Sequence, residues 1–228
     1  MAEQTPPGEL VTITVAAGEQ VTGRWLAPAD ARACYVLAHG AGAGMEHPFM
    51  RATAAQLGAL GIATLRYQFP YLERGAKRPD PPPVCHATVR AAVTEAQRRA
   101  PAAALFAGGR SFGGRMSSQA QALEPLPQVR GLVFLGFPLH PAGRPGVERA
   151  AHLARIGIPM LFVQGRRDAL AEAPLLEQVL QQLGPRASAH WIAQADHSFH
   201  VGARSGRKDA DVLCELLAAA AAWMSEHS

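Results

Sequence analysis

A serine, an aspartate and a histidine, far apart in the chain, have the residue types and the order that nucleophilic catalysis requires. Ser111 lies in "GGRSFGG", with a glycine two positions away on each side. A serine hydroxyl attacks a carbonyl when a base takes its proton and a carboxylate orients that base. His197, in "ADHSFH", and Asp168, at the end of "PMLFVQGRRD", are suited to these roles. The order serine, aspartate, histidine is one in which such triads occur.

The motif around Ser111 needs structural context, because G-x-S-x-G is short enough to arise by chance. The preceding "AALFAGG" has the pattern of a short buried strand, and the following "SFGGRMSSQAQAL" contains no helix breaker after Gly114. A strand, a sharp turn and a helix form a nucleophile elbow, in which the serine has a strained backbone and exposes its hydroxyl. Gly109 and Gly113 remove side chains that would collide with neighbouring elements.

The elements that position these residues alternate between buried strands and helices. Residues 10–16 and 20–27 alternate in polarity and predict an antiparallel hairpin. Short apolar runs then recur, each followed by helical spacing: "ACYVLAH", "IATLRY", "AALFAGG", "GLVFLGFP", "PMLFVQG" and "SAHWIA". The pattern predicts an α/β fold with a mostly parallel central sheet and helices on both faces. Asp168 and His197 then follow strands at the same sheet edge as Ser111.

The chain is expected to form one domain over residues 1–228, with residues 1–9 and 226–228 loose. Helices are predicted to end at Gly61 and Gly184, because glycine suits the left-handed residue after a helix, and a last helix is predicted over 209–224. The proline-rich residues 78–83, "RPDPPP", are interpreted as a loop. This loop is either a surface crossover or, alternatively, the rim of an active site.

Composition excludes several classes of function. All but two of the 22 basic residues are arginines, and they are scattered, so the net charge of +4 does not predict nucleic-acid binding. The three cysteines are far apart, which argues against a disulfide scaffold or a zinc site. No apolar run is long enough for a membrane span and no export signal is evident, so a cytoplasmic protein is expected. A metal is not expected at His197 and His200, because no third ligand accompanies them.

The glycine-rich "HGAGAG" after the first central strand is suited to binding a substrate oxygen. The oxyanion hole is assigned to the backbone N–H groups of Ala41 and Phe112. His39 is interpreted as a structural histidine beneath this loop. Arg110 and Arg115 form ion pairs or, alternatively, recognise an anion. Five residues on nearby loops are candidates for the substrate pocket, although ordinary packing explains each equally well: Met45, His47, Phe137, Leu139 and Phe199.

Several motifs together resemble the α/β-hydrolase superfamily, and within it the small, lidless group related to dienelactone hydrolases. They are "HGAGAGMEHPFM", "LRYQFPY", "GGRSFGGRMSS", "GFPLHP", "LFVQGRRD" and "ADHSFHV", and they extend over about residues 33–201. More narrowly, the chain is similar to the testis-expressed protein 30 and NSL-complex subunit 3 type of hydrolase. The resemblance places Ser111 on the nucleophile, Asp168 on the acid and His197 on the base. Dienelactone hydrolases have cysteine at the elbow, so the serine here argues against dienelactone as the substrate.

The sequence therefore predicts a serine hydrolase that cleaves a small carboxylic ester or thioester without a cofactor, as a monomer or homodimer. Only 15 residues separate "GFPLHP" from "GIPMLFV", where related enzymes often insert a cap, so an open site is expected. The alternative is a non-catalytic protein-interaction module on the same fold, because a fold does not fix a function. A peptidase is disfavoured, because no extended peptide groove is evident.

Overall fold

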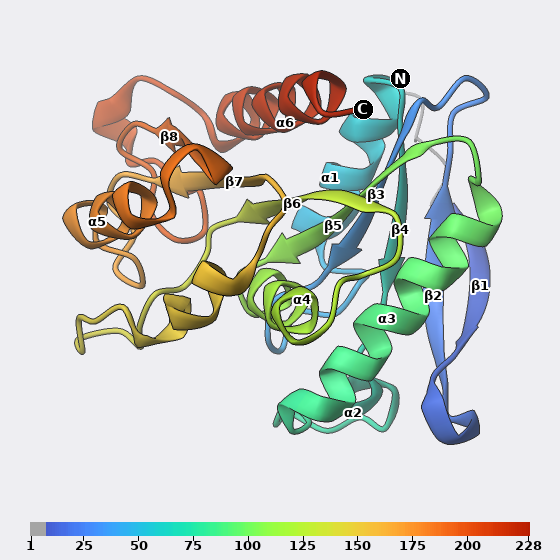
Figure 1. Ribbon diagram of the computed structural model, residues 1–228. Helices are drawn as coiled ribbons and strands as arrows, with labels where there is room; N and C mark the ends of the chain where they lie inside the picture. The colour runs from blue at the N-terminus through green and yellow to red at the C-terminus, as the bar shows by residue number, and fades with distance from the viewer. Residues whose placement is uncertain (1–7) are drawn as a thin grey trace.

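A single eight-stranded sheet forms the centre of the computed structural model, which describes residues 8–228 (Figure 1). The strands are β1 (Glu9–Thr14), β2 (Gln20–Leu26), β3 (Ala33–Ala38), β4 (Ile62–Tyr67), β5 (Ala104–Arg110), β6 (Val129–Leu135), β7 (Met160–Gly165) and β8 (Ala187–Ile192), in the order β1-β2-β4-β3-β5-β6-β7-β8. The first three strands in this order pair antiparallel and all others pair parallel. The predicted hairpin and mostly parallel sheet are confirmed.

Helices cover both faces of this sheet (Figure 1). On one face lie α1 (Pro48–Ala59) and α6 (Asp209–Glu226), and on the other lie α3 (Pro82–Arg99), α4 (Phe112–Leu123) and α5 (Ala173–Leu183). The short α2 (Pro70–Glu73) precedes α3. Four 3₁₀ segments complete the described elements: η1 (Ala16–Gly18), η2 (Glu148–Arg155), η3 (Gly184–Arg186) and η4 (Ala203–Ser205).

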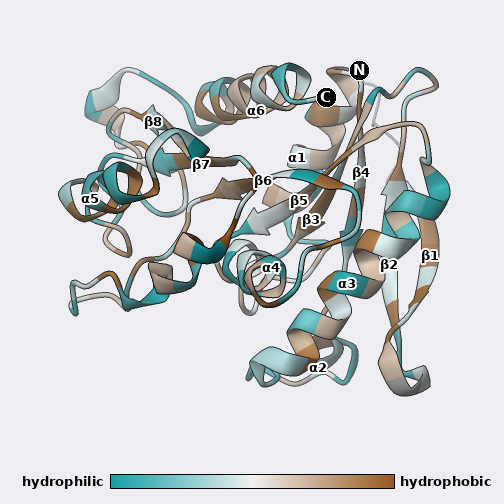
Figure 2. Ribbon diagram, viewed as in Figure 1, coloured by the Kyte–Doolittle hydropathy of each residue, from teal (hydrophilic) through white to brown (hydrophobic). Residues whose placement is uncertain are grey.

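The central strands are apolar on both sides because each side packs against a helical layer. In β3, Cys34, Val36 and Ala38 face the layer of α3, α4 and α5. The alternate residues Tyr35 and Leu37 face α1 and α6. In Figure 2, hydrophobic residues are frequent along the central strands, whereas α3 and α5 carry both hydrophilic and hydrophobic residues. This two-sided burial fixes the register of the strands whose ends carry the candidate site.

The structure differs from the sequence-based boundaries in several places. Pro82 and Pro83 do not belong to a loop, because α3 begins at Pro82, where the fixed backbone angle of proline suits a first helical turn. Of the ends expected to be loose, residues 1–7 lie outside the described residues, while Glu9 begins β1. α6 continues to Glu226, and Ser228 Oγ donates a hydrogen bond to the Met224 carbonyl at 2.7 Å.

The short connection between β6 and β7 leaves the carboxyl edge of the sheet without a cap domain. It contains only a loop and η2. None of the helices in residues 8–228 has the length and apolar character needed to cross a bilayer. The site at this edge is therefore bordered by loops and helix ends of the same domain.

Removing one core ring tests the predicted packing. Phe134 in β6 is fully buried, with ring centroids 5.1 Å from Phe137 and 4.8 Å from Phe162. We expect Phe134→Ala to lower the free energy of unfolding by about 3–5 kcal/mol, because it leaves a cavity. Leu123→Ala, at a side chain that is 62% exposed, is the control and should change it by less than about 1 kcal/mol. Guanidinium denaturation measures both, and equal effects would contradict this packing.

Candidate active site

The three side chains expected to form a triad meet at the carboxyl edge of the sheet. Ser111 follows β5, Asp168 follows β7 and His197 follows β8. The Oγ atom of Ser111 lies 2.9 Å from Nε2 of His197, and Oδ2 of Asp168 lies 2.7 Å from Nδ1 of the same ring. In a neutral imidazole, Nδ1–H then donates to the carboxylate and Nε2 accepts the hydroxyl proton. This is the arrangement in which histidine is able to act as a base.

The backbone at Ser111 is strained, as expected for a nucleophile elbow. Its φ of 47° and ψ of −112° lie where a residue with a side chain is uncommon. A Cβ atom at Gly109 would lie 2.2 Å from the Ala38 carbonyl oxygen, and one at Gly113 would lie 2.5 Å from the same atom. At both distances the added Cβ atom would overlap the Ala38 carbonyl oxygen, so neither position accepts a side chain without movement of the backbone. The two glycines therefore let β5 and α4 approach β3 closely enough to form the turn.

The carboxylate of Asp168 accepts further hydrogen bonds besides the one from His197. Its carboxylate is buried and accepts hydrogen bonds from Gln164 Nε2 at 2.5 Å and from the Leu170 backbone N–H at 2.7 Å. Gln164 Oε1 in turn accepts from the Phe137 N–H at 2.8 Å. Gln164 was not among the residues predicted from the sequence, although an uncharged polar residue inside the apolar strand "PMLFVQG" was a signal for it. These bonds fix the carboxylate that faces His197.

The loop that carries His197 is ordered by a second aspartate. Asp196 Oδ1 accepts hydrogen bonds from the backbone N–H groups of Ser198 and His200, at 2.7 and 3.0 Å. The ring of His200 pairs with a different residue, because its Nδ1 lies 2.8 Å from Oδ2 of Asp209 at the start of α6. This ion pair raises the pKa of His200. No group of three or more His, Cys, Asp or Glu residues within 8–228 is arranged to hold a metal ion.

His39 lies beneath the glycine-rich loop, as the sequence analysis expects. The ring is buried, its Nε2 accepts from the Phe69 N–H at 3.2 Å, and Nδ1 lies 2.8 Å from the Gly40 carbonyl oxygen. Because Nε2 accepts, the ring proton is on Nδ1 and is donated to Gly40. Burial lowers the pKa of His39 to about 4. The residue is thus a neutral support for the loop that contains Ala41.

A cavity of about 380 Å³ opens beside Ser111, and we call it the serine cavity. Ser111, Ala41 and Phe112 line it together. The backbone N–H groups of Ala41 and Phe112 form no hydrogen bond to another described residue. Pro79, Asp80 and Pro82 form part of the same wall, so part of the segment 78–83 borders the cavity beside Ser111.

The five residues expected to line a substrate pocket do not line this cavity. Phe137 and Leu139 are fully buried in the core, and Met45 is buried with its N–H bonded to Gln68. His47 is exposed and caps α1 by accepting the Phe49 N–H at 3.2 Å. Phe199 is buried and stacks on Phe49. Each of the five residues therefore has a packing or capping role in the structure, outside the lining of the serine cavity.

Arg110, next to the nucleophile, does not line the cavity either. Its guanidinium lies 5.1 Å from the ring of Phe49 and 5.3 Å from that of Phe199, and Nη1 donates to the Leu135 carbonyl at 3.3 Å. Burial lowers its pKa to about 10, against the opposing attraction of Asp168 and Asp196. Arg110 therefore remains charged at neutral pH, as a half-buried cation beside the three candidate residues, and within residues 8–228 its charge has no salt-bridge partner.

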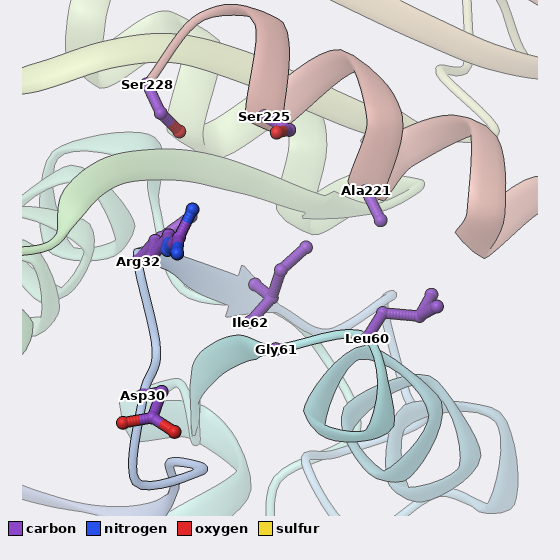
Figure 3. A pocket seen from close by; sticks show the side chains of 9 residues that line it. Asp30, Arg32, Leu60, Gly61, Ile62, Ala221, Ser225 and Ser228 are labelled. Atoms are coloured by element: carbon purple, nitrogen blue, oxygen red, sulfur yellow. The ribbon is translucent and has the colours of Figure 1, made fainter.

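A second cavity, of about 360 Å³, lies at the opposite end of the strands (Figure 3). Asp30, Arg32 and Ile62 line it near the beginnings of β3 and β4, and Ser225 lines it from α6. None of the candidate catalytic residues lies there. The cavity that borders the candidate catalytic residues is therefore the one beside Ser111.

Comparison with known families agrees with this geometry. A family model described as an alpha/beta hydrolase domain matches residues 31–225. The chain therefore belongs to the α/β-hydrolase family, and the resemblance of its motifs to that superfamily is confirmed. The narrower similarity to the testis-expressed protein 30 type stays a prediction.

Solved structures with the same fold cover nearly the whole chain. A dienelactone hydrolase from Anabaena variabilis has a TM-score of 0.76 at 20% identity, covering 96% of this chain and 97% of that one. A serine hydrolase without a lid from Xanthomonas campestris has a TM-score of 0.72 at 20% identity, covering 97% of both chains. A serine hydrolase homologue from Coxiella burnetii has a TM-score of 0.73 at 19% identity, covering 94% and 98%. At these identities the likeness shows the fold.

Adding one methyl group at the elbow tests the close approach of α4 and β3. We expect Gly113→Ala to lower the free energy of unfolding by about 1–3 kcal/mol, because its Cβ would overlap backbone atoms that cannot move freely. Gly157→Ala is the matched control, since a Cβ there meets nothing within 4 Å, and its effect should stay within about 1 kcal/mol. Denaturant unfolding compares them, and an unaffected Gly113→Ala protein would refute the steric argument.

The buried His39 predicts a loss of stability in acid. The folded pKa of about 4 lies below the unfolded value of about 6.5, so between these values the unfolded chain binds more protons. The stabilisation is complete above pH 6.5 and declines as pH falls towards 4, by about 3 kcal/mol in total. His39→Asn should be less stable at pH 7.5 but should lose less on acidification to pH 4.5. Urea unfolding at both pH values tests this, and identical losses would contradict it.

Proposed function

We propose that the protein is a serine hydrolase that cleaves a carboxylic ester or thioester through an acyl-enzyme. The observation that carries the proposal is the pair of hydrogen-bond distances linking Ser111, His197 and Asp168 at 2.9 and 2.7 Å. A buried carboxylate, an oriented imidazole and a strained serine are needed together only for nucleophilic catalysis. Membership of the α/β-hydrolase family agrees with this proposal.

In the first step, Ser111 Oγ attacks the substrate carbonyl carbon while His197 Nε2 accepts the hydroxyl proton. Asp168 keeps the Nδ1–H tautomer and stabilises the imidazolium that forms. The developing oxyanion accepts hydrogen bonds from the N–H groups of Ala41 and Phe112, whose lack of other described partners supports this role. Phe112 also begins α4, so the positive end of the helix dipole favours the negative charge.

Collapse of the tetrahedral intermediate breaks the bond to the leaving group, which takes its proton from His197. Water then attacks the acyl-enzyme with the imidazole again as base, and the acid is released. No cofactor is needed for either half of this reaction. The short connection between β6 and β7 leaves the cavity without a cap domain, which favours substrates small enough to be held by the walls beside Ser111.

Replacing the nucleophile is the direct test. Ser111→Ala should lower kcat for a hydrolysable ester on the order of 10⁴-fold or more, because no other group replaces the attacking oxygen. Purified protein can be assayed with 4-nitrophenyl esters of increasing chain length and with an acyl-CoA. Ser225→Ala, in α6 and away from the elbow, is the control and should retain full activity.

A fluorophosphonate probe distinguishes the enzyme from a non-catalytic interaction module. Covalent labelling of Ser111 in the folded protein, abolished in Ser111→Ala, supports the hydrolase. Near-wild-type esterase activity in Ser111→Ala would refute the assignment of the nucleophile. A folded wild-type protein that neither labels nor hydrolyses any of these esters would favour the interaction module.

A further inference from the structure

Two arginines share the serine cavity with the proposed nucleophile. Arg115 lines it from the first turns of α4, and Arg149 lines it from η2. Ser111 and Arg115 are four residues apart, so they lie on the same side of the helix, about 6 Å apart along its axis. The Arg115 N–H donates to the Ser111 carbonyl at 3.1 Å, which makes this spacing part of the elbow itself.

The charges of these arginines are not compensated by any carboxylate that pairs with them. Arg115 Nε is buried without a hydrogen-bond partner among residues 8–228, and its guanidinium stacks on the Phe112 ring at 5.8 Å. Burial lowers the pKa of Arg115, and the positive charge of Arg149 lowers it further. Arg149 likewise forms no ion pair with a described residue. Two like charges at one cavity are stabilised when an anion lies between them.

The other charged and titratable groups around this pair leave the positive excess in place. Asp80 also lines the cavity, but it forms an ion pair with Arg74. His152 lies near Arg115, and its pKa is lowered to about 4 by burial and by Arg115 and Arg155, so it is neutral. The remaining wall is mostly apolar, formed by side chains suited to an alkyl segment: Pro79, Pro82, Met116, Pro138 and Leu170.

From this arrangement we propose that the serine cavity binds substrates that carry a carboxylate, held by Arg115 and Arg149, with the ester or thioester carbonyl at Ser111. The apolar wall contacts the carbon chain between the two groups. A half-ester of an aliphatic dicarboxylic acid has this combination, and its carboxylate can accept bidentate hydrogen bonds from a guanidinium. This inference specifies the substrate class of the proposed hydrolase and rests on that function.

The kinetic test compares two esters that differ at one end of the chain, where a carboxylate is replaced by its methyl ester. These are 4-nitrophenyl hydrogen adipate, which carries a free carboxylate, and methyl 4-nitrophenyl adipate, which is neutral. The wild-type protein should prefer the charged ester by about 10- to 100-fold in kcat/KM, the range expected for charged hydrogen bonds. Arg115→Gln and Arg149→Gln should each reduce this ratio at least about fivefold, and Arg115→Lys should keep part of it.

Arg130→Gln is the matched control. Arg130 is an exposed arginine in β6 and lies outside the cavity, so its loss should leave both the activity and the ratio unchanged. A wild-type preference for the neutral ester would overturn the proposal. So would a ratio that survives in both Arg115→Gln and Arg149→Gln. The two single variants protect the test against a failure of one of them to fold.

A binding measurement separates this inference from the proposed reaction. Calorimetric titration of Ser111→Ala with adipate, and with neutral adipamide, requires no turnover. Adipate should bind at least about tenfold more tightly than adipamide, and this preference should fall at least about fivefold in Ser111→Ala/Arg115→Gln, which keeps Arg149. If adipate binds but the wild type hydrolyses no ester, the carboxylate site stands and the hydrolase fails. If the wild type hydrolyses both esters equally and adipate does not bind, the hydrolase stands and this inference fails.

Discussion

The close contact between the start of α4 and the end of β3 determines the geometry of the whole site. With glycine at 109 and 113, the carbonyl of Ala38 approaches to within a distance that no Cβ atom would permit. A wider gap would move Ser111 Oγ out of hydrogen-bonding reach of His197 and would turn the Phe112 N–H away from the cavity. The strained backbone at Ser111 costs roughly 1–3 kcal/mol. Burial of one side of α4 against the sheet offsets that cost.

Another glycine permits a close backbone contact where the chain leaves the sheet towards Asp168 and His197. A Cβ atom at Gly165 would lie 2.4 Å from the Ala195 carbonyl, so the turn after β7 packs directly on the loop after β8. The Arg167 N–H donates to that carbonyl at 2.9 Å. Backbone contacts thereby set the separation of Asp168 and His197, and side chains such as Gln164 refine it. Because the strands are parallel and in register, all three residues arrive at one edge.

The fold and the triad geometry were accessible to sequence analysis because their signals are local. Alternating apolar runs indicate buried strands, and the glycines around Ser111 indicate a backbone that only they permit. The substrate-pocket prediction had no such signal. Phe137 and Leu139 follow a strand near the site, but their side chains point into the core, and a sequence does not give that direction. Part of the cavity wall instead comes from Pro79, Asp80 and Pro82 and from Arg149 of η2. These segments become neighbours of Ser111 only when α3 and η2 each pack against α4.

Arg110 and Arg115 illustrate how far sequence and structure can diverge for similar residues. Both flank Ser111, and the sequence allowed the same two interpretations for each. Arg110 ends β5, and its guanidinium lies near the rings of Phe49 and Phe199, on the face covered by α1 and α6. The negative charges of Asp168 and Asp196 stabilise its positive charge there. Arg115, four residues after Ser111, opens onto the serine cavity on the other face, beside a second cation. A cation compensated by nearby carboxylates stabilises the structure around it. A cation without such a partner in a cavity provides binding energy for an anion, so Arg115 is suited to recognition and Arg110 to support.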